Sequence, residues 1–168
     1  WWMLVGVCRS DETVFDRGEE VLGVAWHPER DVFVTCENRA IVHDYEAGRD
    51  ITELAIGFRA TGVAWHPDGD LVIHYDAYRL VAHDPWTGER RYERPGGGDT
   101  TGVAWHPNGD RYLHVLGDGS FCDVDARTGV GEVVHRDPDI VGLEATTAYD
   151  PKGEHVIAFV RGRSEARL

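Results

Sequence analysis

The hexapeptide Gly-Val-Ala-Trp-His-Pro occurs three times in this chain of 168 residues, at residues 23–28, 62–67 and 102–107. The copies lie 39 and 40 residues apart, and a degenerate fourth copy, Thr-Thr-Ala-Tyr-Asp-Pro, follows at residues 146–151. A near-constant period of this length is the signature of a repeat architecture, in which one supersecondary unit is copied along the chain. The sequence therefore predicts a fold made of about four similar units.

Each unit has the pattern of short β-strands separated by polar turns. In the second unit the expected strands are residues 61–65, 71–75, 80–83 and 91–93. Equivalent apolar runs lie at 32–35, 41–43 and 51–56, at 112–116, 120–124 and 130–135, and at 156–160. Because no segment shows sustained helical periodicity, the predicted fold class is all-β, with antiparallel strands.

Two turns recur with the strands. Pro-Asp-Gly at residues 67–69 follows a first strand, and Asp-x-x-Thr-Gly at 84–88 and 125–129 follows a third strand. Four strands per repeat of about 40 residues, joined by these turns, resemble the blades of WD-repeat β-propellers, and the fourth unit is also similar to TolB-type blades. The resemblance covers about residues 20–160 and implies a β-propeller of about four antiparallel four-stranded blades.

The chain departs from the WD-repeat pattern at the dipeptide that names the family. Trp-Asp is replaced by His-Asp at residues 43–44 and 83–84, and by Val-Asp at 124–125. The family's buried hydrogen-bond network is therefore expected to be incomplete. The repeat pattern predicts the superfamily, and it leaves the subfamily open.

A single propeller domain is expected over residues 1–168, with repeats near 20–58, 59–98, 99–142, and 143–168 together with 1–19. Three assemblies fit this content. The N-terminal strands can pair with the C-terminal ones and close a four-bladed ring, two chains can form an eight-bladed ring, or the chain can be part of a larger propeller. An open propeller would leave strand edges and a blade face exposed.

The net charge of −13 argues against nucleic acid or an anionic membrane surface as the partner, since both require clustered Lys and Arg. Cys8, Cys36 and Cys122 lie far apart in sequence, which is not the pattern of a disulfide framework or a zinc site. We expect buried thiols in a reducing compartment, and therefore a cytoplasmic protein.

His27, His66 and His106 stand at equivalent positions between a repeated Trp and a turn Pro. Neighbouring sheets pack about 10 Å apart, whereas a zinc–nitrogen bond is about 2 Å long, so these imidazoles are not expected to share a metal ion. A hydrogen bond across the turn is the expected role, and no metal site is predicted. Buried packing roles are expected for the strand histidines His43, His74, His83 and His114, and for the repeated aromatic residues Trp26, Trp65, Trp105 and Tyr149.

No nucleophile, base and orienting group can be assigned, and no sequence motif for a cofactor or phosphate is present. The predicted function is a non-catalytic propeller that binds a protein partner or associates with itself, without a cofactor. Two alternatives remain open. One is a propeller that binds a carbohydrate or small ligand, and the other is the propeller part of a hydrolase.

In the propeller family, the turns between second and third strands share one rim with the connections between blades. The resemblance places a partner-binding surface there, and Arg and Tyr are favoured at interfaces. The residues expected on this rim are Arg39, Arg59, Tyr78, Arg79, Arg94, Asp99, Asp118, Asp137 and Asp139. Trp86, which lies outside the repeated motif in the turn at 84–88, is expected to be an exposed interface anchor.

Overall fold

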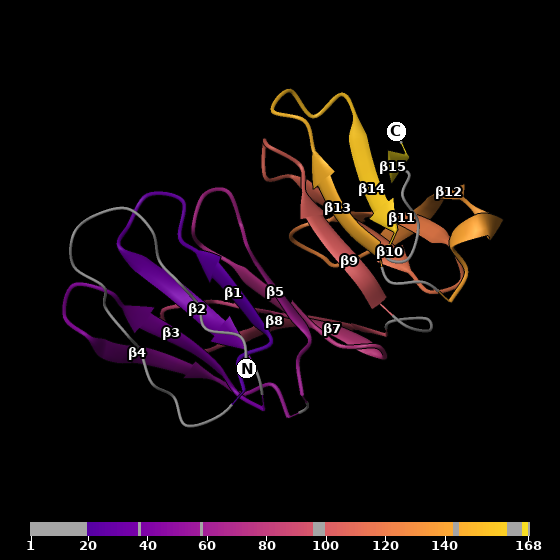
Figure 1. Cartoon of the computed structure of the whole chain (residues 1–168). Helices are drawn as coiled ribbons and strands as arrows, with labels where there is room; N and C mark the ends of the chain where they lie inside the picture. Colours follow the sequence, from indigo (N-terminus) through magenta and orange to yellow (C-terminus); the bar gives the residue numbers. More distant parts are fainter. Residues whose placement is uncertain are drawn as a thin grey trace.

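The computed structural model describes residues 20–36, 38–57, 59–95, 100–142, 145–160 and 166–167. These residues form four antiparallel sheets that follow one another in chain order, from indigo to yellow in Figure 1. Within each sheet the strands are also in chain order, so every strand pairs with its sequence neighbour. The structure confirms the predicted all-β, propeller-like fold.

We call the four sheets blades 1 to 4. Blade 1 consists of β1 (Gly23–Trp26), β2 (Val32–Cys36), β3 (Ala40–Asp44) and β4 (Arg49–Leu54). Blade 2 consists of β5 (Gly62–Trp65), β6 (Val72–Tyr75), β7 (Arg79–His83) and β8 (Arg90–Pro95). Blade 3 consists of β9 (Thr100–Trp105), β10 (Arg111–Leu116), β11 (Ser120–Asp125) and β12 (Gly131–Arg136), followed by the short 3-10 helix η1 (Pro138–Ile140). Blade 4 consists of β13 (Ala145–Tyr149), β14 (Val156–Val160) and β15 (Ala166–Arg167).

Glycine at a positive φ angle closes the recurrent turn after the first strand. Gly69, Gly109 and Gly153 have φ angles of 76°, 76° and 74°. The amide of Gly69 donates a hydrogen bond to the His66 carbonyl over 2.9 Å. This left-handed conformation is open to glycine at little cost, which explains why the turn sequence ends in this residue.

The core lies between the blades, because each sheet packs its faces on its neighbours. Val34 and Val42 of blade 1 share one buried cluster with Trp65 and Val72 of blade 2. Between blades 2 and 3 the corresponding cluster includes Ile73, Leu80, Tyr112 and Val124. Between blades 3 and 4 it includes Leu113, Val115 and Ala145. Burial is deepest in the second and third strands, whereas all of β12 is exposed.

The repeated histidines connect successive blades. The rings of His27, His66 and His106 pack edge-on against Trp65, Trp105 and Tyr149 of the following blade, with centroids 5.1, 4.7 and 5.1 Å apart. His66 Nδ1 accepts the Asp68 amide over 3.0 Å, and Nε2 lies 2.9 Å from the Gly109 carbonyl. The structural role predicted for these residues is confirmed, with the Nε2–H tautomer at His66.

The described sheets form an open arc. No strand pairing among the described residues joins blade 4 to blade 1, and the described part of blade 4 has three strands. The predicted pairing of N-terminal strands with blade 4 concerns residues 1–19, which lie outside the described residues. None of the helices in the described part of the chain has the length and hydrophobicity to span a membrane.

Candidate functional site

One rim of the arc carries the turns between second and third strands together with the connections between blades. We call this surface the loop rim; its described parts are the β2–β3, β6–β7 and β10–β11 turns and the connections at 55–57, 59–61 and 137–142. The two sets of segments touch each other. The Thr61 amide and hydroxyl both donate to the Tyr75 carbonyl at the end of β6, over 2.8 and 3.3 Å.

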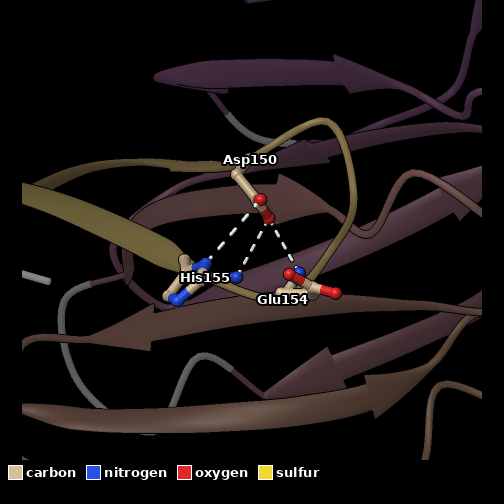
Figure 2. Close-up of side chains that lie close together, drawn as sticks. All are labelled: Asp150, Glu154 and His155. Carbon is tan, nitrogen blue, oxygen red and sulfur yellow. Dashed lines mark hydrogen bonds and ion pairs between the residues drawn. The ribbon is translucent and has the colours of Figure 1, made fainter.

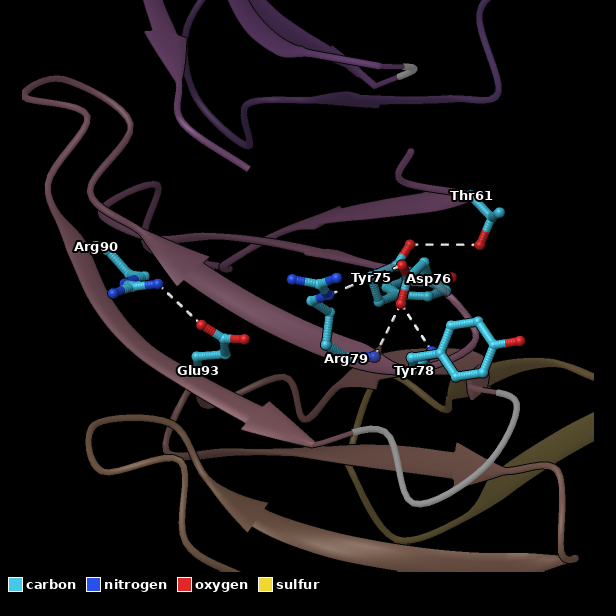
Figure 3. A network of polar contacts seen from close by, with 7 residues as sticks. All are labelled: Thr61, Tyr75, Asp76, Tyr78, Arg79, Arg90 and Glu93. Carbon is cyan, nitrogen blue, oxygen red and sulfur yellow. Dashed lines mark hydrogen bonds and ion pairs between the residues drawn. The ribbon is translucent and has the colours of Figure 1, made fainter. Parts of the chain in front are cut away.

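The β6–β7 turn presents the most exposed aromatic residue among the described ones. Asp76 Oδ1 accepts the amides of Tyr78 and Arg79 over 2.7 and 2.8 Å, so the carboxylate fixes the turn from within (Figure 3). Tyr78 itself is 74% exposed to solvent. Arg79 Nε lies 4.0 Å from Asp76 Oδ2. An exposed aromatic ring and a guanidinium group on one fixed turn can stack on, and hydrogen-bond to, a partner chain. The Arg90–Glu93 ion pair in the same view lies away from this turn.

The β10–β11 turn packs on the connection that follows blade 3. Asp118 Oδ1 accepts the Ser120 amide over 2.9 Å, and Arg136 lies 3.3 Å from the other carboxylate oxygen. Hydrogen bonds from Ser120, assisted by the Arg136 charge, hold the pKa of Asp118 below its ordinary value. The Asp137 amide donates to the Gly119 carbonyl over 2.9 Å. The rim is therefore built from interlocked turns at this point.

Further charged groups occupy the same rim. Asp137 caps η1 by accepting the Asp139 amide over 2.9 Å. Arg39 lies 3.7 Å from Glu53 at the end of β4, and Arg59 pairs with Glu20. The structure thus brings the β2–β3, β6–β7 and β10–β11 turn residues to one rim, and it gives most of their charges a partner of opposite sign.

Arg94 departs from the expectation of an exposed rim residue. The Arg94 side chain is half-buried, with Nη1 enclosed, and points toward Tyr112 and His114 between blades 2 and 3. Burial, followed by the Arg94 charge, lowers the pKa of His114 to about 3. Asp99 lies outside the described residues.

Trp86 is half-buried, which corrects the expectation that it is solvent-exposed. Its ring lies 5.7 Å from His27 and 6.3 Å from Trp65, and the Arg30 guanidinium stacks over it at 4.8 Å. Its turn is fixed by Asp84 Oδ1, which accepts the Trp86 and Thr87 amides. The ring fills the junction between blades 1 and 2, so its place outside the repeated motif did not indicate exposure.

Sequence reasoning missed an acidic hollow of about 540 Å³ on blade 3. It is lined by Asn108, Asp110, Arg111, Asp123, Asp125, Val130, Gly131 and Glu132. Arg111 and Asp125 face each other across β10 and β11, and Arg111 Nη1 lies 3.4 Å from Asp123. Asp125 Oδ1 accepts the Arg127 and Thr128 amides, so this carboxylate closes the β11–β12 turn. Only the pairing of β10 with β11 reveals that these carboxylates share one surface.

Asp150, Glu154 and His155 bring three potential metal-binding atoms within 4.8 Å of one another (Figure 2). Asp150 Oδ1 already accepts the amides of Glu154 and His155, over 2.7 and 2.9 Å. These hydrogen bonds, led by the one from His155, hold the pKa of Asp150 below its ordinary value. Closing the β13–β14 turn accounts for this geometry.

No family model and no curated protein matches the sequence. Among solved structures, 1159 chains match. One of them is the crystal structure of the Cps50 (Swd1) β-propeller domain of Myceliophteria thermophila, with a TM-score of 0.73 and 18% sequence identity. The match covers 86% of this chain and 50% of that one, so the present chain spans about half the length of its structural neighbour. This likeness establishes a β-propeller fold.

Proposed function

We propose that this protein is a non-catalytic β-propeller that binds a protein partner through the loop rim. The observation that carries the proposal is Tyr78, which is 74% exposed on a turn fixed by Asp76. A preformed turn loses little conformational entropy on binding, and Tyr supplies a large contact area with a hydrogen-bonding tip. Location in the cytoplasm stays a prediction from the cysteine pattern.

The charges around Tyr78 favour a polypeptide partner with polar groups at fixed positions. Arg79 follows Tyr78 in the same turn, and Arg39 lies in the corresponding turn of the neighbouring blade. The acids Asp118 and Asp137 follow on blade 3. Positive groups on blades 1 and 2 and negative groups on blade 3 select a partner's register by matching charge to charge. The propeller fold alone supports display of such a surface, and the residues on the rim decide what is bound.

A displayed-peptide selection on the immobilised protein tests the proposal. Peptides enriched on the protein are synthesised, and their dissociation constants are measured for the native chain and for Tyr78→Ala and Arg79→Ala. We expect each substitution to weaken binding at least about tenfold, equivalent to about 1.4 kcal/mol. The controls are Tyr45→Ala and Arg127→Ala in the Asp-capped turns of the opposite rim, and they should leave binding unchanged.

Two results would contradict the proposal. One is a selection that enriches no peptide above a blank surface. The other is a set of peptides that the Tyr78 variant binds as tightly as the native chain, or that the Arg127 control weakens equally. Circular dichroism of every variant shows whether the fold is kept.

A further inference from the structure

The arc ends in two blade faces whose equivalents elsewhere in the molecule are buried. Side chains alternate between the faces of a strand. Val156 packs on blade 3, so Ile157 and Phe159 point away from it and are 41% and 50% exposed. At the other end, Ala25 packs toward blade 2, so Trp26 points away from it and is 54% exposed.

Strand pairing identifies the internal counterparts of these residues. Ile157 pairs with Ala148 as Leu113 pairs with Ala104, and Phe159 stands at the level of Val115. Leu113 and Val115 are 5% and 0% exposed, because blade 4 covers them. Trp26 corresponds to Trp65, which is 7% exposed under blade 1. The leading face of blade 4 and the trailing face of blade 1 are thus the two halves of the junction that already occurs three times inside the chain.

The turn residues at a fourth junction differ from those of the repeat. At the internal junctions a histidine lies against a glycine of the next blade, and a Cβ at Gly109 would come within 2.7 Å of the His66 ring. Blade 4 has Asp150 in the histidine position, and the blade 1 turn has Arg30 in the glycine position. The Arg30 guanidinium stacks over Trp86 at the junction with blade 2, so the fourth junction rests on the exposed apolar residues Ile157, Phe159 and Trp26.

We propose that the partner at these two faces is a second copy of this chain, and that two copies close one eight-bladed ring. Blade 4 of each copy packs on blade 1 of the other, which places Ile157 and Phe159 against Trp26. Two identical junctions related by a two-fold axis satisfy both faces of both copies.

Light scattering coupled to size exclusion provides the test. The expected mass is twice the 18.8 kDa of one chain. Phe159→Glu places a charge in the proposed junction and should give the mass of one chain, whereas Val130→Glu, at a residue 71% exposed on blade 3, should keep the doubled mass. Circular dichroism confirms that each variant remains folded.

A substitution on the opposite face tests the pairing itself. Trp26→Glu should also give the mass of one chain, because Trp26 lies on the blade 1 face that meets Phe159. Mixed in equal amounts, the Trp26→Glu and Phe159→Glu variants should form dimers again, because one junction of each mixed pair then joins two native faces. The recovery also shows that neither variant lost binding through local misfolding.

Three results would overturn the proposal. They are a mass of one chain at every concentration, a ladder of larger sizes as expected for a head-to-tail contact that does not close, and a dimer that survives Phe159→Glu. The loop rim takes no part in the junction, so Tyr78→Ala should leave the mass doubled. The proposed dimer and the proposed peptide binding can therefore be disproved independently of each other.

Discussion

Each repeated histidine depends on the conformation of a glycine in the following blade. His66 fits against the next turn because Gly109 has no Cβ and has a φ angle of 76°. The sequence predicted the hydrogen bond that this imidazole makes within its own turn. It did not reveal the contact with the next blade, because that contact depends on how two repeats pack.

Gly109→Ala should therefore destabilise the protein more than the same substitution at Gly48. Both residues have positive φ angles, and this conformation costs an alanine about 1–2 kcal/mol. A Cβ at Gly48 would meet nothing within 4 Å, whereas at Gly109 it would meet the His66 ring at 2.7 Å. Urea unfolding should show a further loss of about 1–2 kcal/mol for Gly109→Ala. Equal losses would show that the ring moves aside freely.

Buried histidines make stability depend on pH. Burial lowers the pKa of His114 to about 3, and it lowers the pKa of His74 well below its ordinary value of 6.5. Below pH 6.5 the unfolded chain binds protons that the folded chain does not, so the free energy of unfolding falls as pH falls. Each pH unit within this window costs about 1.4 kcal/mol per buried histidine. Above pH 7.5 the effect should vanish, since both states are then neutral.

Urea unfolding of His114→Leu between pH 7.5 and 4.5 measures this dependence. The variant should lose one histidine's share of the slope. The carboxylates with lowered pKa values titrate below pH 4.5. The histidines therefore account for most of the change in stability between pH 7.5 and 4.5. An unchanged slope in the His114 variant would contradict the assignment.

At the scale of the strand, stability is concentrated in the middle of each blade. β2 is buried along its whole length and β12 is exposed along its whole length. Val34 is 0% exposed in the first of these strands, and Val134 is 54% exposed in the second. Val34→Ala should cost about 2 kcal/mol from lost burial and a residual cavity, and Val134→Ala less than about 0.5 kcal/mol. Calorimetric or urea unfolding of both variants compares the same chemical change in two environments.

Strands were predictable wherever the repeat showed its pattern. The expected runs at 71–75 and 120–124 correspond to β6 and β11 within one residue at each end. Local turn residues and alternating apolar positions determine these strands. The short helix η1, the inward position of Arg94 and the junction around Trp86 were not predicted. Each of these features depends on packing between blades, which the repeat period does not predict.

For the molecule as a whole, excess negative charge opposes compactness. The net charge is −13, and surface ion pairs such as Arg90–Glu93 contribute at most about 1 kcal/mol each. Mutual repulsion should therefore outweigh these pairs at low ionic strength. The sequence composition alone predicts this excess of negative charge. The acidic hollow on blade 3 was not predicted from sequence, because it depends on the pairing of β10 with β11.

Salt should raise the thermal unfolding midpoint, because screening weakens the repulsion more than it weakens the few attractive pairs. Midpoints measured from low to about 0.5 M sodium chloride, where the Debye length falls to a few ångströms, test this expectation. Replacing the exposed carboxylates in Glu46→Gln/Glu132→Gln should raise the low-salt midpoint and flatten the dependence on salt. A midpoint that falls as salt is added would mean that attractive ion pairs dominate.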